Sequence, residues 1–273
     1  MRFVWMALGL ALGTAAQQEP EYVSPLGKTY YGRVARQEIL DEIEAKLAHP
    51  NDLGLLLEAG HDYATLRHYR RAIEIYSRGI EKRHDWAPLY RYRGHRYLSL
   101  RDFPSAQRDL EEAARLDPKS FEIRFHLGLA HYLAGDFAGA RNVFSQCLDI
   151  TASDDDRVAA SYWLYLTLRR LEREEDAGKL LDSIGTGMRV ENNVPYLNLL
   201  LLYKGVKREE ELLDPDAATE VELATYGYGV ACWYLFQGEE DRARQLFWKI
   251  VAGPHWPAFG FIAAESELLR TGE

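Results

Sequence analysis

Apolar positions of two size classes recur every 34 residues between residues 53 and 154. The small positions form two columns, which are Gly60, Gly94 and Gly128 and then Ala72, Ala106 and Ala140. Large rings share the same register, in columns formed by Tyr63, Tyr97 and His131 and by Tyr69, Phe103 and Phe137. A fixed period of this length is typical of a chain built from repeated helical pairs.

The period predicts three helical pairs, at residues 53–86, 87–120 and 121–154. In the second pair, the small Gly94 and Ala106 let two antiparallel helices cross closely, and the ring of Tyr97 fills the space around the crossing. Asp117 and Pro118 end the second helix, because proline cannot continue a helix and restricts the residue before it. We therefore expect an all-α solenoid.

The second pair resembles the tetratricopeptide repeat through Tyr90, Gly94, Tyr97, Phe103, Ala106, Leu110, Ala113 and Pro118. The resemblance implies a right-handed superhelix of antiparallel helix pairs whose first helices line a concave groove for peptides or helices of other proteins. The groove positions it implies here are Leu57, His61, Arg91, His95, Phe125, Leu129, Tyr162 and Leu166. The alternative is that some of these aromatic residues belong to the core and that the convex face binds the partner.

Beyond residue 154 the pattern weakens. Residues 155–191 form a degenerate fourth repeat, in which Tyr165 replaces the glycine, so we expect looser or differently angled packing. The period fails in residues 192–223, which suggest an irregular helical segment. Residues 224–273 predict a final repeat and a capping helix, so that helices cap the solenoid at both ends.

The N-terminus carries the three parts of a secretory signal peptide in residues 1–16, with cleavage expected after Ala16. The alternative is a buried N-terminal helix. Residues 17–36 are polar and predict a flexible linker, and residues 37–52 predict an amphipathic helix that either caps the first repeat or exchanges with a second copy in a homodimer. We expect an exported protein, periplasmic or secreted, without a membrane span.

Charge is distributed unevenly along the chain. The whole sequence has a net charge of −9, yet residues 61–108 hold eleven basic side chains against five acidic ones. This asymmetry favours an anionic partner surface at one end or head-to-tail contact between copies. A solvated helix face is the alternative explanation.

Signs of catalysis or of a cofactor are weak in this sequence. Cys147 and Cys232 stand in helical segments as small core residues, with a disulfide between them as the alternative. His61 and His95 occupy one slot of adjacent repeats, which fits polar groove contacts better than a metal. The run Asp154–Asp156 lacks the spacing of a calcium loop and predicts a solvated turn. We expect no enzyme activity, cofactor, metal or nucleic-acid binding.

Two comparisons with known tetratricopeptide proteins narrow the function. The clamp that binds the carboxylate at the C-terminus of chaperones needs lysine and asparagine, whereas the corresponding slots here hold Leu57, His61 and Tyr92. The order of segments resembles the NlpI family of bacterial envelope lipoproteins, although the lipid-bearing cysteine is missing. That resemblance implies a periplasmic homodimer that adapts peptidoglycan-remodelling enzymes and a protease to one another. The alternatives are a component of secretion, pilus or outer-membrane assembly machinery, and a recognition subunit of an enzyme.

Overall fold

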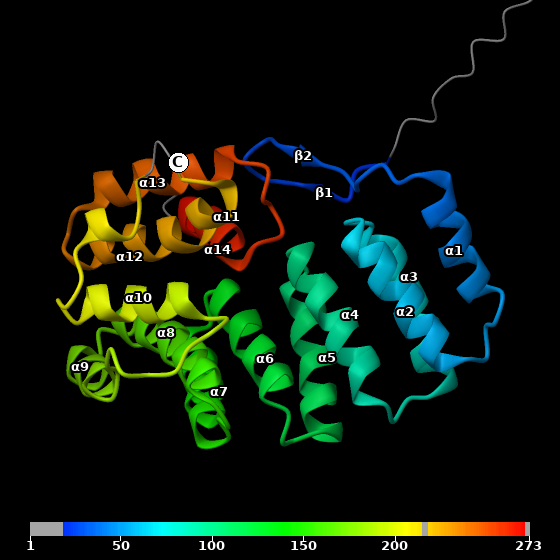
Figure 1. Cartoon of the computed structure of the whole chain (residues 1–273), viewed down its shortest axis with the longest axis horizontal. Coiled ribbons are helices and arrows are strands. Elements are labelled where there is room, and N and C mark those ends of the chain that lie inside the picture. Colours follow the sequence, from blue (N-terminus) through cyan, green and yellow to red (C-terminus); the bar gives the residue numbers. More distant parts are fainter. Residues whose placement is uncertain (1–18, 215–217, 271–273) are drawn as a thin grey trace, which may run out of the picture.

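The computed structural model describes residues 19–214 and 218–270. The predicted signal peptide, residues 1–16, lies outside these residues. Helices follow one another in antiparallel pairs, and two short strands lie near the N-terminal end (Figure 1). In the described ranges, every helix is too short or too polar to cross a bilayer.

The three 34-residue units are three pairs of helices, and each pair begins at the first residue of a predicted unit. They are α2 (Leu53–Thr65) with α3 (Tyr69–Lys82), α4 (Ala87–Ser99) with α5 (Phe103–Leu116), and α6 (Phe121–Leu133) with α7 (Phe137–Asp149). The side chains of Asp52, Asp102 and Asp136 cap α2, α5 and α7 by accepting a backbone N–H of the first turn.

The periodic glycines lie where the two helices of a pair cross. A Cβ atom placed on Gly60 would lie 2.3 Å from the ring of Tyr76, and one on Gly128 would lie 2.5 Å from the ring of Phe144. Gly94 has the same relationship with Leu110, at 2.8 Å. The periodic alanines are fully buried at Ala72, Ala106 and Ala140. The small and large columns therefore serve the close packing that the sequence predicts.

The fourth pair consists of α8 (Asp154–Arg170) and α9 (Glu174–Asp182), and α10 (Val194–Tyr203) packs beside it. Tyr165, which stands in the glycine position, stacks on Tyr203 of α10 with ring centroids 4.6 Å apart. The acidic run at the start of α8 organises the loop before α10, because the Asp155 carboxylate accepts backbone N–H groups from Glu191, Asn192 and Asn193. These aspartates therefore have a structural role at a helix start.

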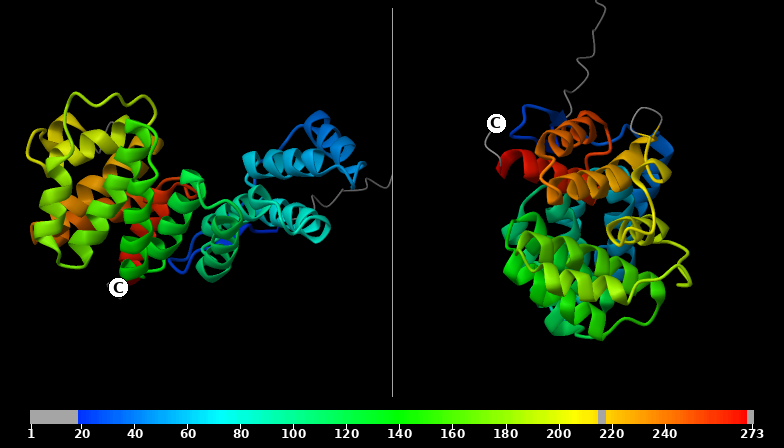
Figure 2. Two further views of the ribbon diagram at one scale, coloured as in Figure 1. Left: turned by 90° about the horizontal axis from the view of Figure 1, so that it is seen from below. Right: turned by 90° about the vertical axis from the view of Figure 1, so that its left-hand side faces the viewer.

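The C-terminal part forms a second layer of helices over repeats two to four. Its elements are η1 (Glu209–Glu211), α11 (Glu220–Glu222), the π-helical turn η2 (Leu223–Gly227), α12 (Tyr228–Phe236), α13 (Glu240–Ala252) and α14 (Phe259–Arg270). Buried polar contacts join the layers: Tyr228 and Tyr132 share a hydrogen bond of 2.8 Å between their hydroxyls, and Glu267 pairs with Arg170. The molecule is thick at this end and narrows toward α1 and α2 (Figure 2).

The segment expected to be a flexible linker is instead ordered over residues 19–36. Strands β1 (Tyr22–Val23) and β2 (Thr29–Tyr30) pair antiparallel, and the rings of Tyr22 and Tyr30 stack on Trp256. Aromatic packing against a residue more than 200 positions away explains why local composition gave the wrong prediction. The next helix, α1 (Gln37–Leu47), buries Ile43 and Leu47 against repeat one of the same chain.

Candidate partner-binding surface

The concave face of the repeats is only partly open. Three of the eight predicted groove residues are core, with 0 % of Leu129, 1 % of Tyr162 and 0 % of Leu166 exposed. Later parts of the chain pack on this face, as shown by Tyr162, whose ring stacks on Tyr196 of α10 at 4.5 Å between centroids. For these three residues the groove prediction is wrong, because the chain folds back over its own concave face.

His95 is also engaged by the C-terminal layer. Its ring stacks on Phe259, the first residue of α14, at 5.4 Å, and lies 4.6 Å from the ring of His126. Burial holds the pKa of both imidazoles below the usual range, to about 3 for His126, where the charge on Arg91 contributes further. Neutral rings fill this part of the groove, so His95 has a packing role.

The part of the concave face that stays accessible lies on repeats one and two. We call Leu57, His61, Arg91 and Tyr92, all half-buried, the open concave surface. His61 meets Tyr92 edge-on at 4.0 Å, and the Arg91 guanidinium lies 4.4 Å above the same ring. Arg91 also pairs with Glu122 at 2.8 Å. Phe125, the remaining predicted groove residue, is half-buried on α6 and packs on Phe144.

Arg96 lies next to the open concave surface and was missed by the sequence analysis. Its guanidinium lies 5.0 Å from the ring centroid of Tyr69, and its Nε is buried without a hydrogen-bond partner in the described part of the chain. Burial is the largest cause of its lowered pKa. The neighbouring Arg93, in contrast, binds the Asp109 carboxylate through two hydrogen bonds of 2.7 Å. The sequence holds no signal that separates the two residues, since the positions three and four away from both Arg93 and Arg96 hold no acid.

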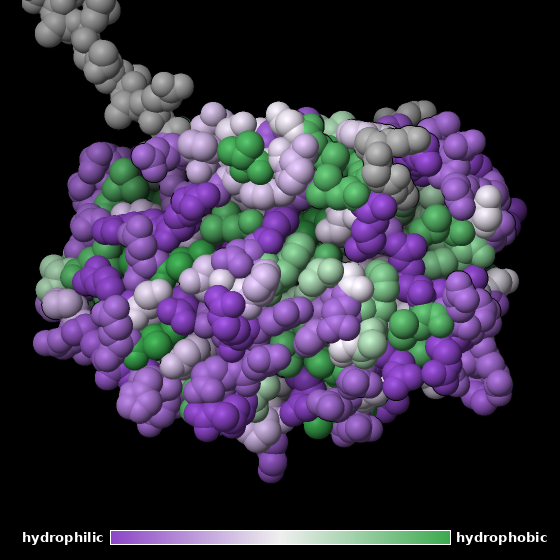
Figure 3. All heavy atoms as spheres, turned by 180° about the vertical axis from the view of Figure 1, so that it is seen from behind, coloured by the Kyte–Doolittle hydropathy of each residue, from purple (hydrophilic) through white to green (hydrophobic). Residues whose placement is uncertain are grey.

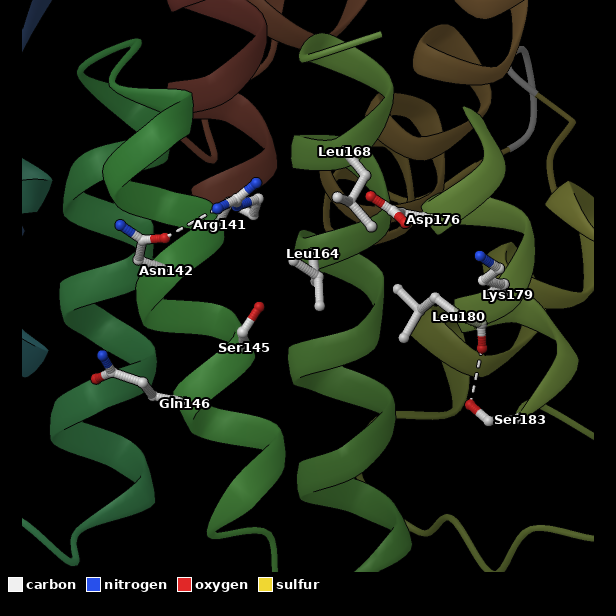
Figure 4. A pocket seen from close by; sticks show the side chains of 10 residues that line it. All are labelled: Arg141, Asn142, Ser145, Gln146, Leu164, Leu168, Asp176, Lys179, Leu180 and Ser183. Atoms are coloured by element: carbon white, nitrogen blue, oxygen red, sulfur yellow. Dashed lines mark hydrogen bonds between the residues drawn. The ribbon is translucent and has the colours of Figure 1, made fainter. Parts of the chain in front are cut away.

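A second concavity, of about 670 Å³, lies between α7, α8 and α9 (Figure 4). The side chains of Leu164, Leu168 and Leu180 form its apolar wall, and Arg141, Asp176 and Lys179 stand at its polar rim.

Among the described residues, His, Cys, Asp and Glu side chains form no group that could hold a metal ion. The face opposite to that of Figure 1 is largely hydrophilic, with hydrophobic side chains in separated patches (Figure 3).

Comparison with known proteins agrees with the repeat pattern. Residues 91–155 match the family model described as tetratricopeptide repeat, which confirms these repeats in the chain. The human tetratricopeptide repeat protein 12 is 31 % identical over 133 residues, which are 47 % of this chain and 18 % of that protein. The heat shock protein STI1 of Saccharomyces cerevisiae is 23 % identical over 179 residues, covering 62 % of this chain and 30 % of that protein.

Among solved structures, one similar chain is YrrB, described as a tetratricopeptide repeat protein with an unusual peptide-binding site. It is 12 % identical, with 85 % of this chain and 97 % of that chain covered at a TM-score of 0.47. The chain spans less than a third of the curated relatives named above.

Proposed function

Because tetratricopeptide repeats are present, we propose that this chain is an exported, non-catalytic scaffold that binds partner proteins through the open concave surface. Repeats of this kind use extended concave surfaces for binding. The observation that carries the proposal is that Leu57, His61, Arg91 and Tyr92 stay accessible while the chain itself covers the neighbouring groove residues. Aromatic and arginine side chains are the types that most often supply binding energy at protein interfaces.

We further propose a periplasmic adaptor role, similar to that of the NlpI family, with peptidoglycan-remodelling enzymes or a protease as partners. This rests on the order of segments in the sequence and on the signal peptide proposed at residues 1–16. The alternatives are a component of secretion, pilus or outer-membrane assembly machinery and a recognition subunit of an enzyme. Sequencing the N-terminus after expression in a Gram-negative host tests export, because cleavage as proposed leaves a chain that begins at Gln17.

The structure bears on the proposal of a homodimer that exchanges α1, because α1 packs on its own chain. The apolar face of α1 is buried in its own chain, where Ile43 and Leu47 are 1 % and 8 % exposed. Tyr63 adds a hydrogen bond of 3.1 Å to Glu44 of α1. Because α1 makes these contacts within one chain, we propose that it caps repeat one of that chain. A molar mass of one chain in light scattering agrees with this, and a mass of two chains contradicts it.

The binding experiment is affinity capture from an envelope extract with residues 17–273 as bait. A Leu57→Ala and Tyr92→Ala double variant removes two side chains of the open concave surface. The matched control replaces Leu116 and Tyr90, which are equally half-buried but pack together in a different cluster. Both variants must unfold at similar temperatures, so that capture reports the surface and not the fold.

We expect the control to retain the partners of the parent chain and the Leu57 and Tyr92 variant to lose them. Cell-wall hydrolases or a protease among the lost partners would support the adaptor role, and secretion or pilus components would support the alternative. Equal capture by both variants would remove the open concave surface from the proposal.

A further inference from the structure

We propose that Arg96 anchors a carboxylate of an acidic peptide that lies extended across the open concave surface. This inference rests on the proposed function and specifies the chemistry of the partner. It adds a residue that the groove prediction does not contain, at the C-terminal end of α4.

The first argument is that Arg96 has no acid as a partner among the residues that the structure describes. Three other largely buried arginines each have a carboxylate: Arg93 pairs with Asp109, Arg101 with Glu265, and Arg170 with Glu267. For Arg96, the described residues supply neither an ion pair nor a hydrogen bond, and the contact they supply is the face of the Tyr69 ring. Buried charges in proteins are normally paired, so a guanidinium held in this state is suited to accept a carboxylate from outside.

The second argument is the charge of the surroundings. Four arginines act electrostatically on Tyr69, which are Arg96, Arg67, Arg33 and Arg101, and of these Arg96 lies over the ring. The carboxylates nearby are already engaged, as Glu122 pairs with Arg91, Glu21 accepts a hydrogen bond from the Arg70 backbone N–H, and Glu265 pairs with Arg101. Asp62 and Glu58, which act on His61, both pair with Lys46. Glu220 acts on Arg67 and His255 at the edge of this region. The positive potential around Arg96 therefore favours an anionic ligand.

The third argument selects a peptide over a small anion. Arg96 acts electrostatically on Tyr92 and His61, whose rings contact each other, and Leu57 lies one helical turn before His61. An extended chain with alternating acidic and apolar side chains can place a carboxylate on Arg96 and an apolar group against these rings. The net charge of −9 over the whole chain opposes a long polyanion such as a nucleic acid, because its ends would reach acidic regions.

The test is fluorescence polarisation with a labelled pentapeptide of alternating Glu and Phe, capped at both ends. The matched probe replaces each Glu by Gln. The protein variants are Arg96→Gln, Arg96→Lys and a control, Arg157→Gln, which removes the same charge from an exposed position on α8. We expect Arg96→Gln to weaken binding of the Glu peptide about tenfold or more, Arg96→Lys to restore part of the affinity, and the control to change it less than about twofold.

A second readout does not depend on any ligand. Replacement of an unpaired, largely buried charge by an apolar side chain of similar length stabilises a fold, so Arg96→Met should raise the Tm by a few degrees. An unchanged or lowered Tm would mean that Arg96 is satisfied within the chain, which would overturn the proposal.

Binding outcomes are equally decisive. Equal affinity for the Glu and Gln peptides, or equal loss in Arg96→Gln and Arg157→Gln, overturns the proposal. If inorganic phosphate at the concentration of the peptide displaces the peptide completely, Arg96 binds small anions in general, and the proposal of a peptide ligand is overturned. If Arg96→Gln captures every partner that the Leu57 and Tyr92 variant loses, the scaffold function stands and the role of Arg96 fails.

Discussion

Arg101 and Glu265 form a buried ion pair that joins the second repeat to the last helix. Nε of Arg101 lies 2.7 Å from Oε2 of Glu265, and the two side chains are 9 % and 2 % exposed. Arg101 lies in the turn between α4 and α5 with φ of 60°, and its guanidinium also donates to the carbonyl oxygen of Trp256 at 3.0 Å. Tyr22 of β1 and Ser24, which follows this strand, donate to the same glutamate. One carboxylate thus connects three distant parts of the chain.

Replacing one partner of this pair should destabilise the fold strongly. Arg101→Met leaves a buried carboxylate without its cation, and we expect a loss of about 3 kcal/mol in the free energy of unfolding, measured by urea titration. Glu265→Gln should cost a similar amount, while the double variant should be less destabilised than the sum of the two. A strictly additive double variant would show that the pair has no coupling energy.

Stability should fall in acid because of the buried histidines. The pKa of His126 is about 3 in the folded chain, chiefly through burial, whereas an unfolded histidine titrates near 6.5. The unfolded state therefore binds more protons between these values, and stability decreases as pH falls from about 7 to about 4, by up to about 1.4 kcal/mol per unit for one ring. The measurement is urea unfolding at several pH values.

A matched pair of variants isolates this contribution. His126→Asn should flatten the dependence on pH, because an amide does not titrate in this range, while the exposed His84→Asn serves as control. Identical slopes in both variants and the parent chain would contradict the assignment.

Replacing Gly260 by alanine should destabilise the fold more than the same replacement at an exposed helical glycine. A Cβ atom at this position would lie 1.7 Å from the carbonyl oxygen of Ala224, so α14 or η2 must shift. We expect Gly260→Ala to cost about 3 kcal/mol. Gly178 on α9 is the control, since its Cβ would meet nothing within 4 Å and alanine there should stabilise by about 0.5–1 kcal/mol. Thermal unfolding of both variants checks the prediction, and a tolerated Gly260→Ala would show that α14 sits farther from η2.

Both cysteines should be unreactive in the folded protein. Cys147 and Cys232 are free and buried, and burial raises the pKa of each thiol to about 12. Because the thiolate is the reactive form, Ellman's reagent at about pH 8 should modify neither until guanidinium chloride unfolds the chain. A Ser145→Cys variant places a thiol at the concavity between α7, α8 and α9, and this thiol should react with the reagent at once. Rapid reaction of the parent chain would show local opening of α7 or α12.

Local pattern and long-range packing differed in how far the sequence could predict them. The columns of Gly60, Gly94 and Gly128 identify the helical pairs, because each glycine meets a residue of the adjacent helix. The stack of Phe259 on His95 has no such signal, since it joins a helix end to a repeat far along the chain. For the same reason the sequence placed Tyr162 in the groove and residues 17–36 in a linker. Arg96 had no signal in the sequence either, because Arg93, which binds Asp109, equally lacks an acid three or four positions away.

The contacts of α14 with the second repeat also have a mechanical consequence. In a row of helical pairs, each unit contacts only its neighbours. Small changes in the angle between neighbouring units therefore add along the row and change its curvature easily. Here the ion pair of Arg101 with Glu265 and the stack of Phe259 on His95 join α14 to the second repeat and restrict such changes. We therefore expect the curvature of the open concave surface to stay constant when a ligand binds. Widening this surface would first require these two contacts to break.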